Sequence, residues 1–397
     1  MDGGMSMQAE GASSQADTSV KHQLVKKSGI VLTDQQRLAW LRLIRSDNVG
    51  PITFRSLINH YGSAEKALAM IPELAARGGS SRRIRIAKTD EAERELETAA
   101  RFGGRFVGIG EPDYPPALRA MEGAPPLLAM HGSGAVATRP ALGIVGARNS
   151  SVAGSKFTVM IAEAAARAGY TVVSGLARGI DTAAHRASLS YGTLAAIAGG
   201  LDQPYPPENI ELYKNICSDG GVAISEMPYG WIPRARDFPR RNRLIAGCAL
   251  AVVVVEAAHR SGSLITARLA NECGREVLAV PGSPLDPRAH GSNGLIRQGA
   301  TIICEVSDVL EALAPLSQIE IPFSGSVGEE KADESDAPPP DDSDRTRIAQ
   351  ALGPSPCDID DLIRFTGVHA AAVHLILLEL DLAGRLVRHS GGTVSLA

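Results

Sequence analysis

Short apolar runs alternate with helical segments between residues 103 and 323, and this alternation constrains the fold more than any other feature. The runs are almost continuously apolar, which is typical of strands buried on both faces. Strands that alternate with helices predict an α/β domain with a doubly wound, mostly parallel sheet and right-handed crossovers. We expect strands at 141–145, 171–175, 193–198, 222–225, 251–256, 276–280 and 300–304.

The segments on either side of this domain predict two smaller domains. Residues 33–100 place apolar side chains at helical spacing and predict a small all-helical domain. Its turn at 48–53 resembles a helix-hairpin-helix connection, which offers backbone N–H groups to phosphate, although packing explains it as well. Residues 324–344 are rich in acidic residues and proline, and predict a flexible linker.

Residues 345–397 predict three helices followed by a hairpin, an arrangement that is like a winged helix. Many winged helices read DNA with their third helix. Here the third predicted helix, 369–382, contains no lysine or arginine and carries Glu379 and Asp381. We therefore expect this helix to contact protein or to pack internally rather than to read DNA.

The composition narrows the possible classes of protein. The chain has 397 residues and a net charge of −4, so any binding of nucleic acid must depend on local charge. Residues 1–32 lack the pattern of a secretory signal and no apolar run is long enough for a membrane span, so we expect a disordered start and a cytoplasmic protein. The five cysteines include no C-x-x-C pair, and we expect neither disulfides nor a metal.

Glycine, serine and arginine follow several of the expected strands. The carboxyl ends of parallel strands and the N-termini of the following helices are common anion sites. Arg148 stands where the second glycine of a dinucleotide fingerprint would fall, and no acidic residue ends the second strand, so we expect no nucleotide cofactor. The candidate phosphate-binding residues in these loops are Gly146, Arg148, Ser150, Ser174, Gly175, Arg178, Gly179, Ser261, Gly262 and Ser263.

Residues 233–247, "PRARDFPRRNRLIAG", concentrate five arginines around Phe238 with one acidic residue, Asp237. An aromatic ring among guanidinium groups suits single-stranded nucleic acid, because bases stack on the ring while phosphates pair with the arginines. The alternative places Phe238 in the core and pairs the arginines with Glu226 or Glu256. We expect Arg243 to be tied up internally. The candidates for the site are Arg234, Arg236, Phe238, Arg240, Arg241 and Asn242, with Arg240 or Arg241 touching phosphate.

Eight motifs, in order along the chain, resemble the DNA-processing protein A family (DprA, also called Smf). They are "IVGARNSS", "VVSGLARGIDTAAHRASL", "GGLDQPYPPEN", "ISEMPYG", "DFPRRNRLIAG", "VVVVEAAHRSGSLITARLA", "REVLAVPGS" and "GSNGLIRQGA". The resemblance implies an extended Rossmann-like fold that binds single-stranded DNA and loads the RecA recombinase during natural transformation. It also implies a homodimer through the Rossmann-like part, no enzymatic activity, and a DNA pocket that includes Arg148, Phe238 and either Arg236 or Arg234.

Two other functions remain open from the residues. A nucleotide- or nucleoside-processing enzyme on a related sheet would use Glu256 and Asp181 as its carboxylates. His185 is a candidate base, although a histidine on such a helix more often packs through hydrogen bonds. A structural adaptor, working through the terminal domains, is the third hypothesis.

Overall fold

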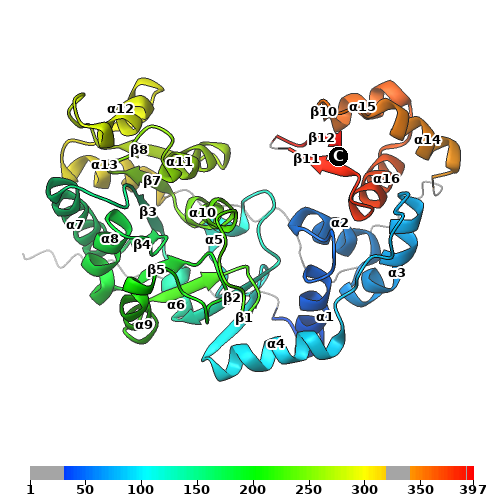
Figure 1. The fold of residues 1–397 in the computed structure, drawn as a ribbon, viewed down its shortest axis with the longest axis horizontal. Helices are drawn as coiled ribbons and strands as arrows, with labels where there is room; N and C mark the ends of the chain where they lie inside the picture. The colour runs from blue at the N-terminus through cyan, green and yellow to red at the C-terminus, as the bar shows by residue number, and fades with distance from the viewer. Residues whose placement is uncertain (1–30, 319–339, 390) are drawn as a thin grey trace, which may run out of the picture.

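A nine-stranded sheet forms the centre of the larger lobe in the computed structural model, which describes residues 31–318, 340–389 and 391–397 (Figure 1). The strand order is β1-β2-β6-β5-β4-β3-β7-β8-β9, and every pair from β6 to β9 is parallel. This confirms the doubly wound, mostly parallel sheet. The seven parallel strands are β3 Ala141–Val145, β4 Thr171–Ser174, β5 Thr193–Ala196, β6 Val222–Ser225, β7 Ala251–Val254, β8 Glu276–Ala279 and β9 Thr301–Ile302.

Two strands at one edge of the sheet were not predicted. β1 (Gly104–Gly108) and β2 (Leu127–Gly132) pair antiparallel, and β2 then pairs antiparallel with β6. Several predicted strands were also too long by one or more residues. Gly175, for example, lies beyond the end of β4 and begins the loop that forms part of the candidate site.

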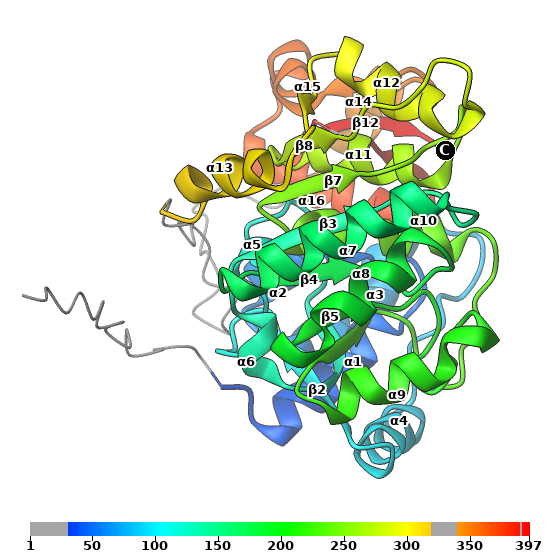
Figure 2. The same ribbon diagram turned by 90° about the vertical axis from the view of Figure 1, so that its left-hand side faces the viewer.

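Helices cover both faces of the sheet (Figure 2). Leu142 and Ile144 of β3 share a core with helices α7 (Val152–Arg167), α8 (Ile180–Ser188) and α13 (Val306–Leu316). Val145 lies in the other core, with α10 (Asp237–Cys248) and α11 (Gly262–Glu272). The remaining helices of the lobe are α5 Pro116–Arg119, α6 Gly134–Ala137, α9 Ile210–Ser218 and α12 His290–Arg297.

Four helices form the N-terminal domain: α1 Asp34–Ile44, α2 Pro51–Tyr61, α3 Ala64–Arg77 and α4 Thr89–Arg101. Thr33 begins α1 with a capping box, in which its side chain and that of Gln36 each accept from the other's backbone N–H. Residues 1–30 of the expected disordered start lie outside the described residues. Leu32 does not belong to a disordered segment, because it is buried and its N–H donates to Glu111 Oε1 (3.2 Å).

Three helices and a three-stranded sheet form the C-terminal winged-helix domain. The helices are α14 Asp342–Ala351, α15 Ile359–Thr366 and α16 Ala370–Leu382, and the strands are β10 Cys357–Asp358, β11 Leu386–Arg388 and β12 Thr393–Leu396, in the order β10-β12-β11. Residues 324–339 of the expected linker lie outside the described residues. α14 begins at Asp342, so residues 342–344 belong to a helix and not to the linker.

The third helix of this domain, α16, packs against α3 and α2 of the helical domain, and together they form the second lobe (Figure 1). Within the described residues no single helix is long and apolar enough to cross a membrane. The pair α15 and α16 passes that test by length and composition together, but it is bent by 118°.

Candidate nucleic-acid interface

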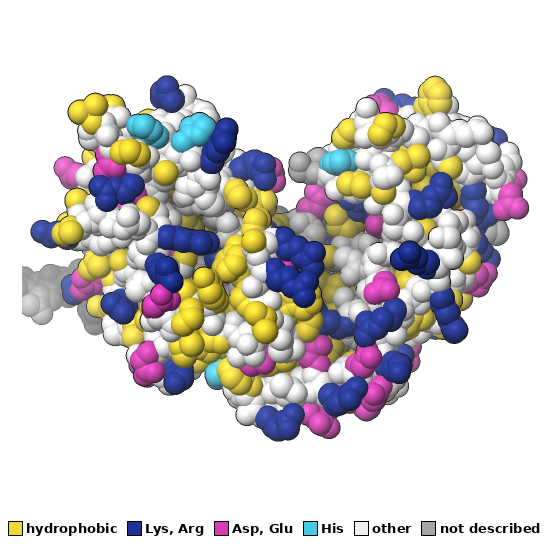
Figure 3. Space-filling model, viewed as in Figure 1, with side chains coloured by type: hydrophobic (Ala, Val, Ile, Leu, Met, Phe, Trp, Pro, Cys, Tyr) yellow, Lys and Arg dark blue, Asp and Glu magenta, His cyan; other side chains and the backbone are white. Residues whose placement is uncertain are grey.

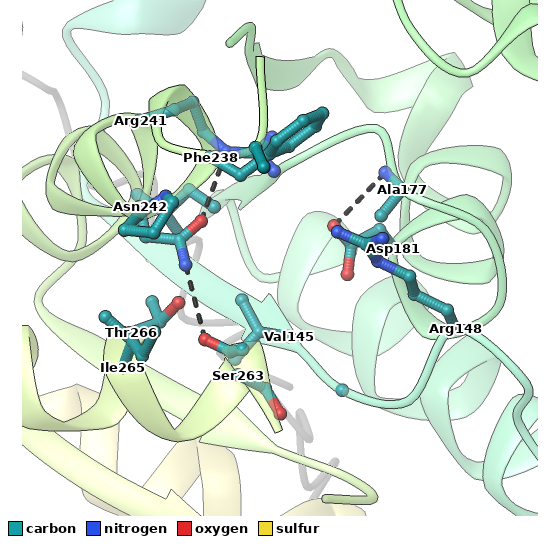
Figure 4. Close-up of a pocket in the computed structure, with 15 residues that line it drawn as sticks. Val145, Arg148, Ala177, Asp181, Phe238, Arg241, Asn242, Ser263, Ile265 and Thr266 are labelled. Atoms are coloured by element: carbon teal, nitrogen blue, oxygen red, sulfur yellow. Dashed lines mark hydrogen bonds between the residues drawn. The ribbon is translucent and has the colours of Figure 1, made fainter. Parts of the chain in front are cut away.

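A pocket of about 340 Å³ opens where the loops after β3 and β4 meet the first turns of α10 and α11 (Figure 4). We call it the main pocket. Its position follows from the fold, because the carboxyl ends of adjacent parallel strands converge there. It is lined by Val145, Gly146, Arg148, Ala177, Asp181, Ala235, Phe238, Pro239, Arg241, Asn242, Ile245, Gly262, Ser263, Ile265 and Thr266.

Arg241 places a buried positive charge in the wall of the main pocket. Its Nη1 donates to the carbonyl oxygens of Gly175 and Ala196 (2.8 Å to Ala196). Burial lowers the pKa of Arg241 to about 10, and the charge of Asp181 opposes this shift. The guanidinium therefore stays charged at neutral pH, with its Nη1 bonded to the backbone and its Nε bonded to Asn242. Arg241 contributes a fixed positive charge to the wall of the pocket.

Asp181 is buried behind this wall and holds the loop that follows β4. Its Oδ2 accepts from the N–H groups of Gly175 (3.1 Å) and Ala177 (3.3 Å). Burial raises the pKa of Asp181, and the charge of Arg241 opposes this rise. The carboxylate thus shapes the loop and balances the charge of Arg241.

Phe238 forms the rim of the main pocket and is half-buried rather than part of the core. The guanidinium carbon of Arg148 lies 5.5 Å from the centroid of its ring, and that of Arg241 lies 5.9 Å away. Arg148 itself is exposed. The structure therefore brings together an aromatic face, an exposed cation and a buried cation, as predicted for Arg148 and Phe238.

A smaller hollow of about 40 Å³ adjoins the main pocket, and we call it the side slot. Both share Arg148, Ala177 and Phe238, while Arg178, Tyr205 and Pro206 belong to the side slot. Arg178 is exposed and forms an ion pair with Glu208 (2.5 Å). Tyr205 and Pro206 were not among the predicted site residues. They lie in the loop that follows β5, at the same edge of the sheet as the other loops of the pocket. That position could have predicted them from the sequence.

The first glycine loop differs from the expected anion site. Ser151 begins α7, and the carboxylate of Glu256 accepts from both its N–H (2.9 Å) and its Oγ (2.6 Å). Ser150 pairs with Ser155 through their hydroxyl oxygens (2.7 Å). The N-terminus of α7 is therefore occupied by the protein's own carboxylate. Ser150 lines neither the main pocket nor the side slot, so its predicted phosphate contact gains no support from this arrangement.

Three other predicted contacts have structural roles. Ser174 is fully buried and donates to the carbonyl of Ile144 (2.7 Å). A Cβ on Gly146 would lie 2.6 Å from the Ile180 side chain. Gly179 has φ +73°, and a Cβ there would lie 2.3 Å from the carbonyl oxygen of Ala147. These glycines let the loops after β3 and β4 approach each other, so they do not need a ligand to explain them.

The N-terminus of α11 faces the main pocket through Gly262 and Ser263. The hydroxyl oxygens of Ser261 and Ser263 lie 2.7 Å apart. Asn242 accepts from Nε of Arg241 (3.2 Å) and donates to the carbonyl of Gly262 (3.3 Å). Asn242 therefore joins α10 to α11 at the wall of the pocket, in agreement with a structural role for this side chain.

The other arginines of residues 233–247 point to different partners, and none of them lines the main pocket or the side slot. Arg243 is paired internally as predicted, with Glu226 (2.5 Å) and the carbonyl of Gly123 (2.7 Å). Arg240 is about half exposed and lies 3.3 Å from Glu226. The guanidinium of Arg234 lies over the ring of Trp231 (4.9 Å), and Arg236 is exposed at the N-terminus of α10.

His185 is fully buried, and its pKa falls to about 3 because of that burial. Its Nδ1 lies 2.9 Å from Thr193 Oγ1, which itself donates to the carbonyl of Val172. Its Nε2 accepts from the N–H of Leu176 (3.3 Å). Both ring nitrogens are therefore used inside the protein, which agrees with a packing residue and not a base.

Comparison with known families decides where the chain belongs. Residues 105–314, more than half of the chain, match the family model described as DNA recombination-mediator protein A. The chain belongs to this family. Residues 34–98 match the DprA-like N-terminal HHH domain, and residues 332–392 match the DprA winged helix domain. The predicted membership in the DNA-processing protein A family is confirmed.

Relatives within the DNA recombination-mediator protein A family align along most of the chain. The protein Smf of Synechocystis is 31% identical, over 91% of this chain and 98% of its own length. The protein Smf of Escherichia coli is 36% identical, over 71% and 75%. The X-ray structure of DNA processing protein A from Streptococcus pneumoniae is 32% identical, with a TM-score of 0.58 over 71% of this chain and 98% of that chain.

Proposed function

We propose that the protein binds single-stranded DNA at the main pocket and acts in the processing and recombination of incoming DNA. The observation that carries this proposal is the group at the pocket mouth: the exposed guanidinium of Arg148 over the half-buried ring of Phe238. Membership in a family of DNA recombination mediators agrees with it. Beneath this group, Arg241 is held by two backbone carbonyls and supplies a fixed positive charge that favours a phosphate.

The geometry at the pocket mouth supports the proposed preference for single strands. Phe238 can stack a base only if that base is not already stacked and paired within a duplex. Arg148 pairs with a phosphate, which carries no sequence information. Binding should therefore be largely independent of sequence, in contrast to a reader of base edges.

We further propose the cellular role that the family resemblance implies. In this role the protein brings the RecA recombinase onto single-stranded DNA during natural transformation, in the cytoplasm, and acts as a homodimer through the Rossmann-like domain without a cofactor. Relatives named DNA processing protein DprA occur in Bacillus subtilis and Streptococcus pneumoniae, at 39% and 42% identity over about half of this chain.

The two carboxylates that the enzymatic alternative would use are both bonded within the protein. Glu256 accepts from the backbone and side chain of Ser151, and Asp181 accepts from the backbone of the loop after β4. A general acid or base must instead reach the reacting group of a substrate. These bonds favour a binding protein over a hydrolase.

A titration with labelled single-stranded and duplex oligonucleotides tests the proposal. We expect the wild type to prefer single strands, and Arg148→Ala to weaken that binding by roughly 10- to 100-fold, the cost of a charge-assisted contact. Arg268→Ala is the matched control, because Arg268 is exposed on α11 and lines neither the main pocket nor the side slot. Equal affinity for both DNA forms, or equal affinities of wild type and Arg148→Ala, would contradict the proposal.

A further inference from the structure

Tyr205 is 45% exposed and its ring lies beside that of Phe238. The two ring centroids are 5.7 Å apart and the planes are inclined by 68°. In this edge-to-face arrangement the edge of one ring meets one face of the other, and the exposure of Tyr205 shows that part of its side chain still faces solvent. A stacking surface therefore remains available next to the ring that forms the rim of the main pocket.

The backbone around Tyr205 is held in place by its neighbours. The loop after β5 and the loop before α10 are joined by the N–H of Gly200 to the carbonyl of Trp231 (3.0 Å) and by the N–H of Gly230 to Asp202 Oδ1 (2.8 Å). On the other side of Tyr205, the side chain of Asn209 donates to the carbonyl of Leu176 (2.8 Å). A fixed aromatic surface costs less ordering on binding than a mobile one.

Each of the two aromatic rings has an arginine that lines the same hollow. Arg148 belongs to the wall that the main pocket and the side slot share, and Arg178 belongs to the side slot alone. The ion pair of Arg178 with Glu208 is exposed at both partners, 57% and 56%. Exposed pairs of this kind are weak, so a phosphate can replace Glu208 as the partner of Arg178.

We propose that Tyr205 and Arg178 form a second nucleotide subsite, adjacent to the one at Phe238 and Arg148. The inference rests on the proposed binding of single-stranded DNA and extends it. One base stacks at Phe238, the next stacks on the exposed face of Tyr205, and their phosphates pair with Arg148 and Arg178. The side slot itself is too small to admit a base, so the second base lies over Tyr205 rather than inside the protein.

The test is a titration of the full-length protein with labelled oligothymidylate. Tyr205→Ala should weaken binding about tenfold, the value of one stacked base, whereas Tyr205→Phe should keep the wild-type affinity. Tyr191→Ala is the matched control, because Tyr191 is 36% exposed but precedes β5 at the opposite end of that strand.

A second variant tests the charge. Glu208→Gln removes the carboxylate that competes with phosphate for Arg178, and it should tighten binding by up to about fivefold at low salt. Unchanged affinity in Tyr205→Ala, with binding still lost in Arg148→Ala, would overturn the second subsite and leave the proposed function intact. No binding by the wild type would overturn both. Weaker binding by Glu208→Gln would show that the pair with Arg178 is structural and would remove Arg178 from the subsite.

Discussion

Arg241, at the scale of a single residue, places a cation in the wall of the main pocket and also holds the backbone behind it. It holds two backbone carbonyls that belong to the loop after β4 and to the end of β5. Replacing it by alanine leaves these buried acceptors unpaired and leaves Asp181 without its nearest balancing charge. We expect Arg241→Ala to lower the free energy of unfolding by about 2–4 kcal/mol, measured by chemical denaturation.

Arg240 provides the comparison within the same helix. It is about half exposed and pairs with Glu226 at the surface. Arg240→Ala should cost only about 0–1 kcal/mol of unfolding free energy. A similar small loss for both variants would mean that Arg241 does not hold the two loops together.

His185 predicts a pH dependence of stability. Its pKa is about 3 in the folded protein, against an ordinary value of 6.5, because burial disfavours the imidazolium. The unfolded chain therefore binds a proton that the folded protein does not, and stability is lost as the pH falls from about 6.5 toward 3. Between pH 7 and pH 5, His185→Gln should lose about 2 kcal/mol less than the wild type in denaturant titrations.

Equal losses in the two proteins would show that His185 is not the group responsible. Asp181 acts in the opposite direction, since a raised carboxyl pKa favours the folded state as the pH falls. Its contribution is common to both proteins and cancels in the comparison.

The sequence could not predict which polar side chains of the site already have a hydrogen-bond partner inside the protein. Arg148 and Phe238 line one pocket, which loop position and residue type could predict, whereas their binding of DNA stays a prediction. Ser174 and Ser150 stand in the right loops, but tertiary hydrogen bonds to Ile144 and Ser155 use their hydroxyl groups. Whether a polar side chain already has a partner depends on residues far along the chain, such as Glu256 for the first turn of α7.

At the level of elements, α16 is the clearest case of a helix whose role follows from its composition. Asp381 accepts from Thr53 Oγ1 (2.8 Å) and from Arg388 Nε (2.9 Å). Leu378 and Leu382 belong to the same core as the helical domain. The helix that reads DNA in many winged helices is here an interdomain contact, in agreement with its lack of basic residues.

Gly78 lies at the centre of this contact and offers a direct test. It follows α3, and a Cβ there would lie 2.0 Å from the carbonyl oxygen of Glu379 on α16. Gly78→Ala should therefore separate the two helices and cost about 1–3 kcal/mol of unfolding free energy. Thermal unfolding and limited proteolysis of the winged-helix domain would detect the change.

Gly294 is the control for this substitution. It lies within α12, where a Cβ would meet no atom within 4 Å. Gly294→Ala should be neutral or stabilising by up to about 1 kcal/mol. If Gly78→Ala also left stability and protease resistance unchanged, α16 would not be docked on α3 as the structure places it.

The central strands that were predicted correctly share one property, burial on both faces. The parallel strands β3 to β8 show as apolar runs because both faces need apolar side chains. β1 and β2 were missed because they include polar residues and glycine, such as Arg105 and His131, and because they depend on antiparallel pairing, β1 with β2 and β2 with β6. An antiparallel edge pair of this kind is defined by its partner strand more than by its own pattern.

For the whole molecule, the order of the domains could be read from the sequence but their arrangement could not. Arg37 forms a bidentate contact with Glu111 (2.7 and 2.8 Å), and Arg45 donates to the carbonyl of Glu226 (3.1 Å). These scattered polar contacts fix the helical domain against the sheet. The space-filling view shows a hollow between the two lobes, with Lys and Arg side chains on both sides (Figure 3).

The charge of the whole chain gives the last prediction. With a net charge of −4, the molecule has no bulk attraction for DNA, so salt dependence should come from a few local contacts. Each phosphate contact on a single strand contributes about −0.7 to the slope of log affinity against log salt. Arg148→Ala should therefore make the slope less steep by about 0.7, measured by titrations at several salt concentrations.

Tyr205→Ala should lower the affinity for single-stranded DNA without changing the slope, because this substitution removes no charge. Arg268→Ala, a surface variant, is the control. If it reduced the slope as much as Arg148→Ala does, diffuse surface charge and not the main pocket would hold the DNA.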